Sequence, residues 1–289
     1  MSKSALVTSE WLAECPGSAE IRLVDASTFP PNVPRKAKQE YLEAHIPGAA
    51  FFDVDAIADT SRALPHMLPS PEKFGRMVGE LGIGNQHTII AYDSLGLFSA
   101  PRVWWMFRAM GHEQVFVLDG GLPKWQAEGR ATTSALPALP PVPFAARLNP
   151  ALVRTLAQVK ADSATKASQL VDARSPGRFS GEEEEIWPGR RRGHIPGAAN
   201  VFFGSLIDPA RKTLLPRDSL EKVFAGLDLA RPVTTTCGSG VTACVLALAL
   251  FELGKRDVAV YDGAWAEWGL PDSGCPVEVG ALSNSQTAL

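Results

Sequence analysis

The chain has 289 residues, of which 45% are hydrophobic and 20% are charged, and its formal net charge is -3. This length and balance predict a soluble globular protein of one large or two ordinary domains, whose core needs no staples. The small negative charge argues against partners such as nucleic acid or an anionic membrane, and no apolar run reaches the roughly 20 residues of a transmembrane helix.

The beginning of the chain, MSKSALVTSEWLAE, has no apolar core behind a basic head. A secretory signal and an Arg-rich transit peptide are therefore not expected. The four cysteines form no C-x-x-C pair, so the sequence predicts neither a zinc site nor a disulfide framework. A reducing compartment fits best, and a cytoplasmic location is predicted.

The predicted elements of the first half alternate between strands and helices. Buried strands are expected at 21–25, 88–92 and 115–119, and helices at 71–82 and 100–111. A proline-rich stretch without helical periodicity follows at 135–150, which predicts an extended linker. Short apolar strands that alternate with helices are typical of a parallel α/β sheet.

The second half has the same pattern. Strands are expected at 169–172, 233–236 and 258–262, a helix at 241–254, and a loose tail after Gly280. Three motifs of the first half recur in order and at nearly equal offsets: LVDAS and LVDAR, HIPGAAFF and HIPGAANVFF, VFVLDGGLPKW and VAVYDGAWAEW. This repeat predicts two similar domains, 1–134 and 151–289, joined by the linker at 135–150.

The stretch TTTCGSGVTACVLALAL places a cysteine in the turn between a predicted strand and a predicted helix. A thiolate is the reactive form of cysteine, and the free N–H groups of a helix start favour an anion. Gly238 and Gly240 allow the backbone to curl around the sulfur, since glycine accepts positive φ. The first copy has Asp93 where the second has Cys237. We therefore interpret Cys237 as a nucleophile that only one copy carries, against the alternative of a buried structural cysteine.

The loop CGSGVTA, together with the two HIPGA motifs, the DGG-x-x-x-W and DGAWAEW motifs and the APRVWWMFRAMG stretch, resembles the 3-mercaptopyruvate sulfurtransferase family. The resemblance implies an α/β fold of two tandem rhodanese-like domains, each a mainly parallel sheet flanked by helices. It also implies that the first domain is inactive and that the second holds the site. Cys237 would then take sulfur from 3-mercaptopyruvate as a persulfide and pass it to a thiol such as thioredoxin or glutathione, or to cyanide, without a metal or an organic cofactor.

The loop separates two related activities. Thiosulfate sulfurtransferases resemble this chain but carry the basic loop CRKGVTA, whose cations suit a dianion. Here Gly238 and Ser239 stand at those positions, which favours 3-mercaptopyruvate. We expect the donor to lie against the loop residues Gly238, Gly240, Val241 and Thr242, and Thr242 to cap the following helix.

The resemblance also implies arginines that bind the donor carboxylate. Arg178 matches the first of them, and a guanidinium can grip a carboxylate through two hydrogen bonds. The alternative for Arg178 is a surface salt bridge to the run 182–185, which is expected to be solvated. The second arginine is replaced by Trp187. Arg190, Arg191 or Arg192 could substitute for it, and Arg190 is favoured because it is closest.

A Ser-His-Asp relay is implied as well. Ser239 matches its serine, while His66 and Asp55 match its other members. Such a relay could deprotonate the donor thiol or polarise its carbonyl.

Three other functions are weighed against this one. A cysteine phosphatase needs an arginine six residues after the nucleophile, where this chain has Ala243. A non-catalytic sulfur-sensing module would not need to turn over. A thiosulfate-preferring sulfurtransferase would share the chemistry but differ in its donor.

Overall fold

The computed structural model describes residues 4–15 and 19–280, so the predicted tail after Gly280 lies outside the described residues. The chain divides into two compact units. The first comprises the residues up to Ser61, Leu68–Asn149 and Asp208–Leu214, and the second comprises Arg62–Met67, Pro150–Ile207 and the residues from Leu215 onward. The short segment 62–67 thus belongs to the second unit although it lies early in the sequence.

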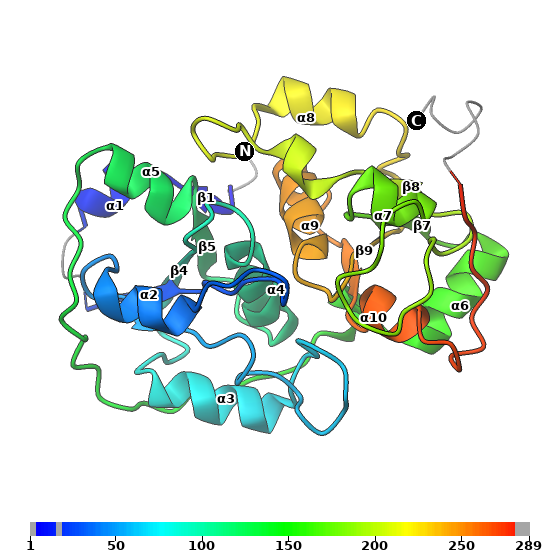
Figure 1. The fold of residues 1–289 in the computed structure, drawn as a ribbon. Coiled ribbons are helices and arrows are strands. Elements are labelled where there is room, and N and C mark those ends of the chain that lie inside the picture. Colours follow the sequence, from blue (N-terminus) through cyan, green and yellow to red (C-terminus); the bar gives the residue numbers. More distant parts are fainter. Residues whose placement is uncertain (1–3, 16–18, 281–289) are drawn as a thin grey trace. The chain divides into compact units, whose positions relative to one another are not determined.

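The first unit contains a parallel sheet in the order β1-β5-β4-β2-β3. Its strands are β1 (Leu6–Val7), β2 (Ile21–Asp25), β3 (Ala50–Phe51), β4 (Thr88–Tyr92) and β5 (Val115–Leu118). Its helices are α1 (Ser9–Ala13), α2 (Ala37–Glu43), α3 (Pro71–Glu80), α4 (Ala100–Ala109) and α5 (Gly121–Ala127) (Figure 1). The three strands and two helices predicted for this half are all present.

The second unit repeats this topology with the strand order β6-β10-β9-β7-β8. Its strands are β6 (Val153–Arg154), β7 (Gln169–Asp172), β8 (Ala199–Asn200), β9 (Val233–Thr236) and β10 (Ala259–Tyr261). Its helices are α6 (Leu156–Thr165), α7 (Pro176–Ser180), α8 (Arg217–Val223), α9 (Ala243–Glu252) and α10 (Ala264–Trp268), with two 3-10 turns at Pro150–Leu152 and Phe203–Leu206. The predicted fold of two similar α/β domains with parallel sheets is confirmed.

Each unit builds its core around one helix that is buried on nearly every side. All ten residues of α4 are buried, and so are nine of the ten residues of α9. Such helices are stable only when they are covered on all sides. Helix α4 packs on β4 and β5, and α9 packs on β9 and β10 (Figure 1). Both helices follow directly on the loop that leaves the middle strand, so the core holds that loop in place.

The repeated HIPGA histidines have the same structural part in both units. His45 stacks on Tyr41 and shares a hydrogen bond between its Nδ1 and the Tyr41 carbonyl. His194 does the same with Phe179. Each histidine also forms an isolated antiparallel bridge, His45 with Thr133 and His194 with Glu278. These contacts fit the fold role that a motif shared by both copies suggests.

The proline-rich segment is extended, and its residues 135–149 pack along the first unit. Phe144 is buried against Phe74 and Phe107, and the N–H of Val142 donates to the carbonyl of Gly79. Gly79 has no room for a side chain there, because a Cβ would lie 2.4 Å from the Val142 oxygen. The domain boundaries at 134 and 151 stay predictions. No helix among the described residues has the length and apolar character needed to cross a membrane.

Candidate active site

Cys237 is the first residue after β9, in the turn that leads to α9. Its side chain is 2% exposed, and its Sγ accepts a hydrogen bond from the N–H of Gly240 at 3.2 Å. Gly240 has φ +80, a conformation that a residue with a side chain adopts only at a cost. The turn therefore curls around the sulfur at Gly240, as the sequence predicts for this glycine.

The loop is anchored to the start of α10. The carbonyl of Cys237 accepts the N–H of Trp265, and that of Gly238 accepts the N–H of Ala266. The Sγ of Cys244, on the first turn of α9, donates to the Gly240 carbonyl at 3.3 Å. Cys244 is fully buried, which suits a core residue better than a resolving thiol. These bonds fix the backbone on which the nucleophile stands.

Asp93 occupies the corresponding loop of the first unit and shows what that loop binds. Its Oδ2 accepts backbone N–H groups from Phe98, Ser99 and Ala100 at 2.8–2.9 Å, and its Oδ1 accepts one from Leu95. The Asp93 carbonyl is held by the N–H of Leu122 in α5, as the Cys237 carbonyl is held from α10. The loop of this fold is thus an anion nest. In the first unit a carboxylate of the chain itself fills it.

Ser239 and His66 meet beside the nucleophile. The Nδ1 of His66 lies 3.0 Å from the Oγ of Ser239, and both side chains are buried. His66 has φ +58, which is uncommon for a residue with a side chain and is tolerated chiefly where the surroundings require it, often at functional sites. Two of the three predicted relay residues therefore lie in contact within the second unit.

Asp55, the third predicted member, belongs to the first unit. It is exposed, and its backbone N–H donates to Oδ1 of Asp53. Its part in a relay stays a prediction.

Arg178 faces the nucleophile loop from α7. A Cβ placed on Gly238 would lie 2.8 Å from the Arg178 Nη2. The same guanidinium binds Glu185, with Nη2 2.5 Å from Oε2. Arg178 therefore lies close to the loop, as the predicted substrate role requires. It also forms a salt bridge to the acidic run, as the alternative predicts.

Glu185 corrects the prediction that the run 182–185 is solvated. Its side chain is 2% exposed and bridges Arg178 to Arg174, whose Nη1 lies 2.5 Å from Oε1. Arg174 also grips Asp172 and lies over the ring of Trp265. Burial opposes the charge of Arg174, but Asp172 and then Glu185 more than offset it, so the pKa of Arg174 is raised. The spacing of four glutamates gives no sign that the last one turns inward.

Gly238 and Thr242 depart from their predicted parts. Gly238 is not among the glycines with positive φ in the described chain. Its lack of a side chain instead makes room for Arg178 and for Trp187, whose Nε1 would be 3.3 Å from a Cβ at this position. Thr242 precedes α9, but its side chain makes no capping hydrogen bond to the described residues, so the predicted cap is wrong. Whether Gly238, Gly240, Val241 and Thr242 contact the donor stays a prediction.

Arg190 has partners of its own. Its Nε donates to the carbonyl of Ala266 and its Nη1 to that of Pro188. These bonds tie the turn after Trp187 to α10. A substrate role for Arg190 stays a prediction and would require these carbonyls to be released.

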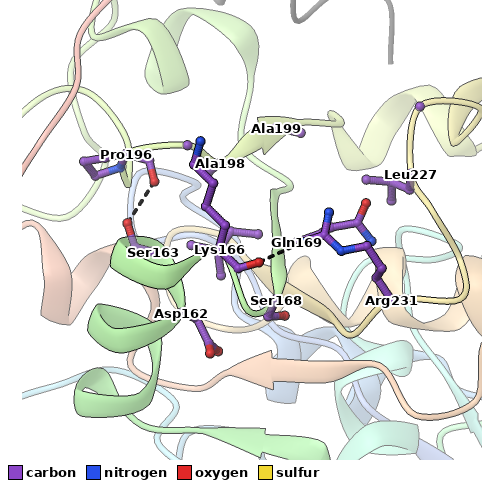
Figure 2. Close-up of a pocket in the computed structure, with 13 residues that line it drawn as sticks. Asp162, Ser163, Lys166, Ser168, Gln169, Pro196, Ala198, Ala199, Leu227 and Arg231 are labelled. Carbon is purple, nitrogen blue, oxygen red and sulfur yellow. Dashed lines mark hydrogen bonds between the residues drawn. The ribbon is translucent and has the colours of Figure 1, made fainter.

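A separate pocket of about 250 Å³ lies at the end of the second sheet that is opposite to Cys237. Figure 2 shows it at the amino ends of the strands, where Ser163 points to the carbonyl of Pro196 and the Lys166 carbonyl meets Arg231. Ligands of open α/β sheets bind at the carboxyl ends of the strands, which is where Cys237 stands. Among residues 4–15 and 19–280, no group of three or more His, Cys, Asp or Glu side chains is arranged to hold a metal ion.

Comparison with known proteins shows the family to which the chain belongs. The sequence model of the rhodanese-like domain matches residues 8–128 and again 155–270. The chain belongs to the rhodanese-like domain family. Among rhodanese-like proteins it is 45% identical to "Thiosulfate/3-mercaptopyruvate sulfurtransferase 2" of Arabidopsis thaliana, over 91% of this chain and 83% of that protein. It is 43% identical to the 3-mercaptopyruvate sulfurtransferase of Escherichia coli K12, over 93% of this chain and 96% of that protein.

A solved rhodanese structure has the same fold. The crystal structure of SseA from Escherichia coli, described as a 3-mercaptopyruvate sulfotransferase, superposes with a TM-score of 0.83. It covers 91% of this chain and 99% of that one at 42% identity. The family resemblance expected from the sequence motifs is confirmed.

Proposed function

We propose that the chain is a sulfurtransferase that moves a sulfur atom from 3-mercaptopyruvate to a thiol or cyanide acceptor through a persulfide on Cys237. The observation that carries the proposal is the backbone N–H that faces its Sγ. The N–H of Gly240 points to that sulfur. In the corresponding loop of the first unit, four N–H groups donate to the carboxylate of Asp93. Its similarity to relatives named for 3-mercaptopyruvate supports the same function.

The first half of the reaction forms the persulfide. The Cys237 thiolate attacks the donor sulfur, a new S–S bond forms, and the C–S bond of 3-mercaptopyruvate breaks. The electron pair of that bond passes to the departing carbon as the enolate of pyruvate, which takes up a proton. Cys237 then holds the transferred sulfur as the outer atom of a persulfide, so one difficult transfer becomes two easier ones.

Ser239 and His66 are placed to assist this step in the proposed mechanism. The hydroxyl of Ser239 either donates to the carbonyl oxygen of the donor as the enolate forms or takes the proton of the donor thiol. His66 holds that hydroxyl and exchanges its proton. Asp55 is proposed to orient His66, and Arg178 to bind the donor carboxylate through its guanidinium.

The second half of the reaction regenerates the free thiolate of Cys237. A thiolate or cyanide attacks the outer sulfur, the S–S bond breaks, and its electron pair returns to Cys237 as thiolate. The products are a persulfide of the acceptor, or thiocyanate. No electrons enter or leave, so the proposal needs no redox cofactor. A thiol such as thioredoxin or glutathione is the proposed acceptor, and the cytoplasm is the proposed location.

Mass spectrometry of the intact protein tests the proposal. After exposure to 3-mercaptopyruvate, Cys237 should gain the mass of one sulfur atom, and cyanide should remove it with release of thiocyanate. Cys237→Ser should give neither, whereas Cys275→Ser should behave like the wild type. A higher kcat/KM on thiosulfate than on 3-mercaptopyruvate would establish the thiosulfate alternative. A persulfide that no acceptor discharges would establish a sensing module.

A further inference from the structure

The indole of Trp187 presents an unexplained polar group to the nucleophile loop. Its Nε1 is buried and has no hydrogen-bond partner among the described residues. This atom would lie 3.3 Å from a Cβ on Gly238, the residue that follows Cys237. Buried N–H groups are nearly always paired in folded proteins, and one that is not calls for an explanation.

The surroundings of the indole place this N–H among the groups of the proposed site. The ring meets the imidazole of His66 edge to face, with 5.7 Å between centroids and an interplanar angle of 79°. His66 in turn binds Ser239. On the other side, the Nη2 of Arg178 faces the same backbone at Gly238. Trp187 therefore stands between the residue that would bind the donor's carboxylate and the pair that would act on its carbonyl.

The indole N–H calls for an acceptor rather than a charge. The guanidiniums of Arg174 and Arg178 are matched by the carboxylates of Asp172 and Glu185 in one connected cluster. Trp187 adds a donor but no charge, because the indole N–H is a neutral group that only donates. A carbonyl or carboxylate oxygen can accept its hydrogen bond, and a 2-oxo acid carries both.

We propose that Trp187 is a donor-binding residue whose Nε1–H donates a hydrogen bond to a polar oxygen of the sulfur donor, at the position where the family resemblance implies an arginine. The inference rests on the proposed function. The buried N–H is without a partner because its partner arrives with the donor.

Nuclear magnetic resonance provides a direct test that does not need turnover. Each tryptophan indole gives one N–H resonance, and the resonance absent from Trp187→Phe or Trp187→Arg belongs to Trp187. Addition of pyruvate, the sulfur-free product and a singly charged 2-oxo acid, to the Cys237→Ser protein should shift this resonance downfield. The resonance of Trp11, an exposed tryptophan of the first unit, should not move. An unmoved Trp187 resonance at saturating pyruvate would overturn the inference.

Kinetics provide the second test. Trp187→Phe keeps the ring and removes the N–H, so the KM for 3-mercaptopyruvate should rise about tenfold while kcat changes little. Trp11→Phe should match the wild type. Unchanged KM in Trp187→Phe would refute the role of Trp187 while leaving the sulfurtransferase intact. A wild-type protein that forms no persulfide would instead refute the proposed function.

Discussion

The Nδ1 of His66 lies 3.0 Å from the Oγ of Ser239, although 173 residues separate them in the sequence. His66 reaches this position in a left-handed conformation with φ +58. A residue in an uncommon backbone conformation that makes a hydrogen bond beside Cys237 supports the proposed functional role of this contact.

The two residues should act as a unit. Replacement of either His66 or Ser239 by Ala should lower kcat/KM for 3-mercaptopyruvate by about 10²-fold or more. The double variant should be hardly worse than the poorer single variant, because residues that act together are not additive. Steady-state assays with cyanide measure this, and additive losses would show that the two side chains act separately.

Asp93 should be essential to the stability of the first unit. Asp93→Ala would leave four N–H groups, two of them buried, without their acceptor, at a cost of about 3 kcal/mol or more in the free energy of unfolding. Urea denaturation measures this cost. Asp272→Ala, which removes an exposed carboxylate, should be nearly neutral, and an equal loss in both variants would contradict the anion-nest interpretation.

Gly240 should matter for both stability and activity. Gly240→Ala places a side chain at φ +80 and should cost about 1 kcal/mol of stability, while distortion of the N–H that faces Cys237 should slow persulfide formation. Gly254 is a matched control in the same unit, since it has φ +102 and open space around it. Gly254→Ala should lose similar stability but keep its activity. If Gly240→Ala and Gly254→Ala had equal activities, the conformation of the loop at Gly240 would not be required for catalysis.

Glu185 should restrain Arg178. Glu185→Gln removes one negative charge from a cluster in which charges balance. Stability should fall by about 3 kcal/mol, because two buried guanidiniums lose a partner. The KM for donor anions should fall too, most for thiosulfate. Glu184→Gln, at an exposed pair with Arg192, should change neither quantity. A rise in KM would show that Glu185 holds Arg178 in its binding position.

His87 should make the first unit sensitive to mild acid. Burial lowers its pKa from 6.5, with Arg22 and His112 adding to the effect, and its Nδ1 accepts the N–H of Gly84. A histidine whose pKa is lower in the folded than in the unfolded chain contributes stability above pH 6.5 and loses that contribution as the pH falls. Urea midpoints should therefore drop between pH of about 7.5 and about 5.5, and the drop should be smaller in His87→Gln. An equal drop would assign the effect to other groups.

The strands and central helices could be predicted because their apolar character is local and the repeat displays it twice. The position of Cys237 at the turn after the central strand could be predicted for the same reason, since Cys237 and Asp93 occupy matching turns, while its role as nucleophile stays a prediction. Glu185 could not, because its burial depends on arginines at two other positions. The hydrogen-bond pattern of Trp187 depends likewise on how a loop folds over Gly238, which no spacing in the sequence encodes.

The segments that make up each unit determine whether the chain can be cut into two working halves. Residues 62–67, which carry His66, are counted with the carboxyl-terminal half, and residues 208–214 with the amino-terminal half. Severing the polypeptide within its proline-rich stretch would yield two products, each missing a piece of its own body. The proposed persulfide chemistry should thus depend on an unbroken chain, although only the second unit carries a cysteine at this turn.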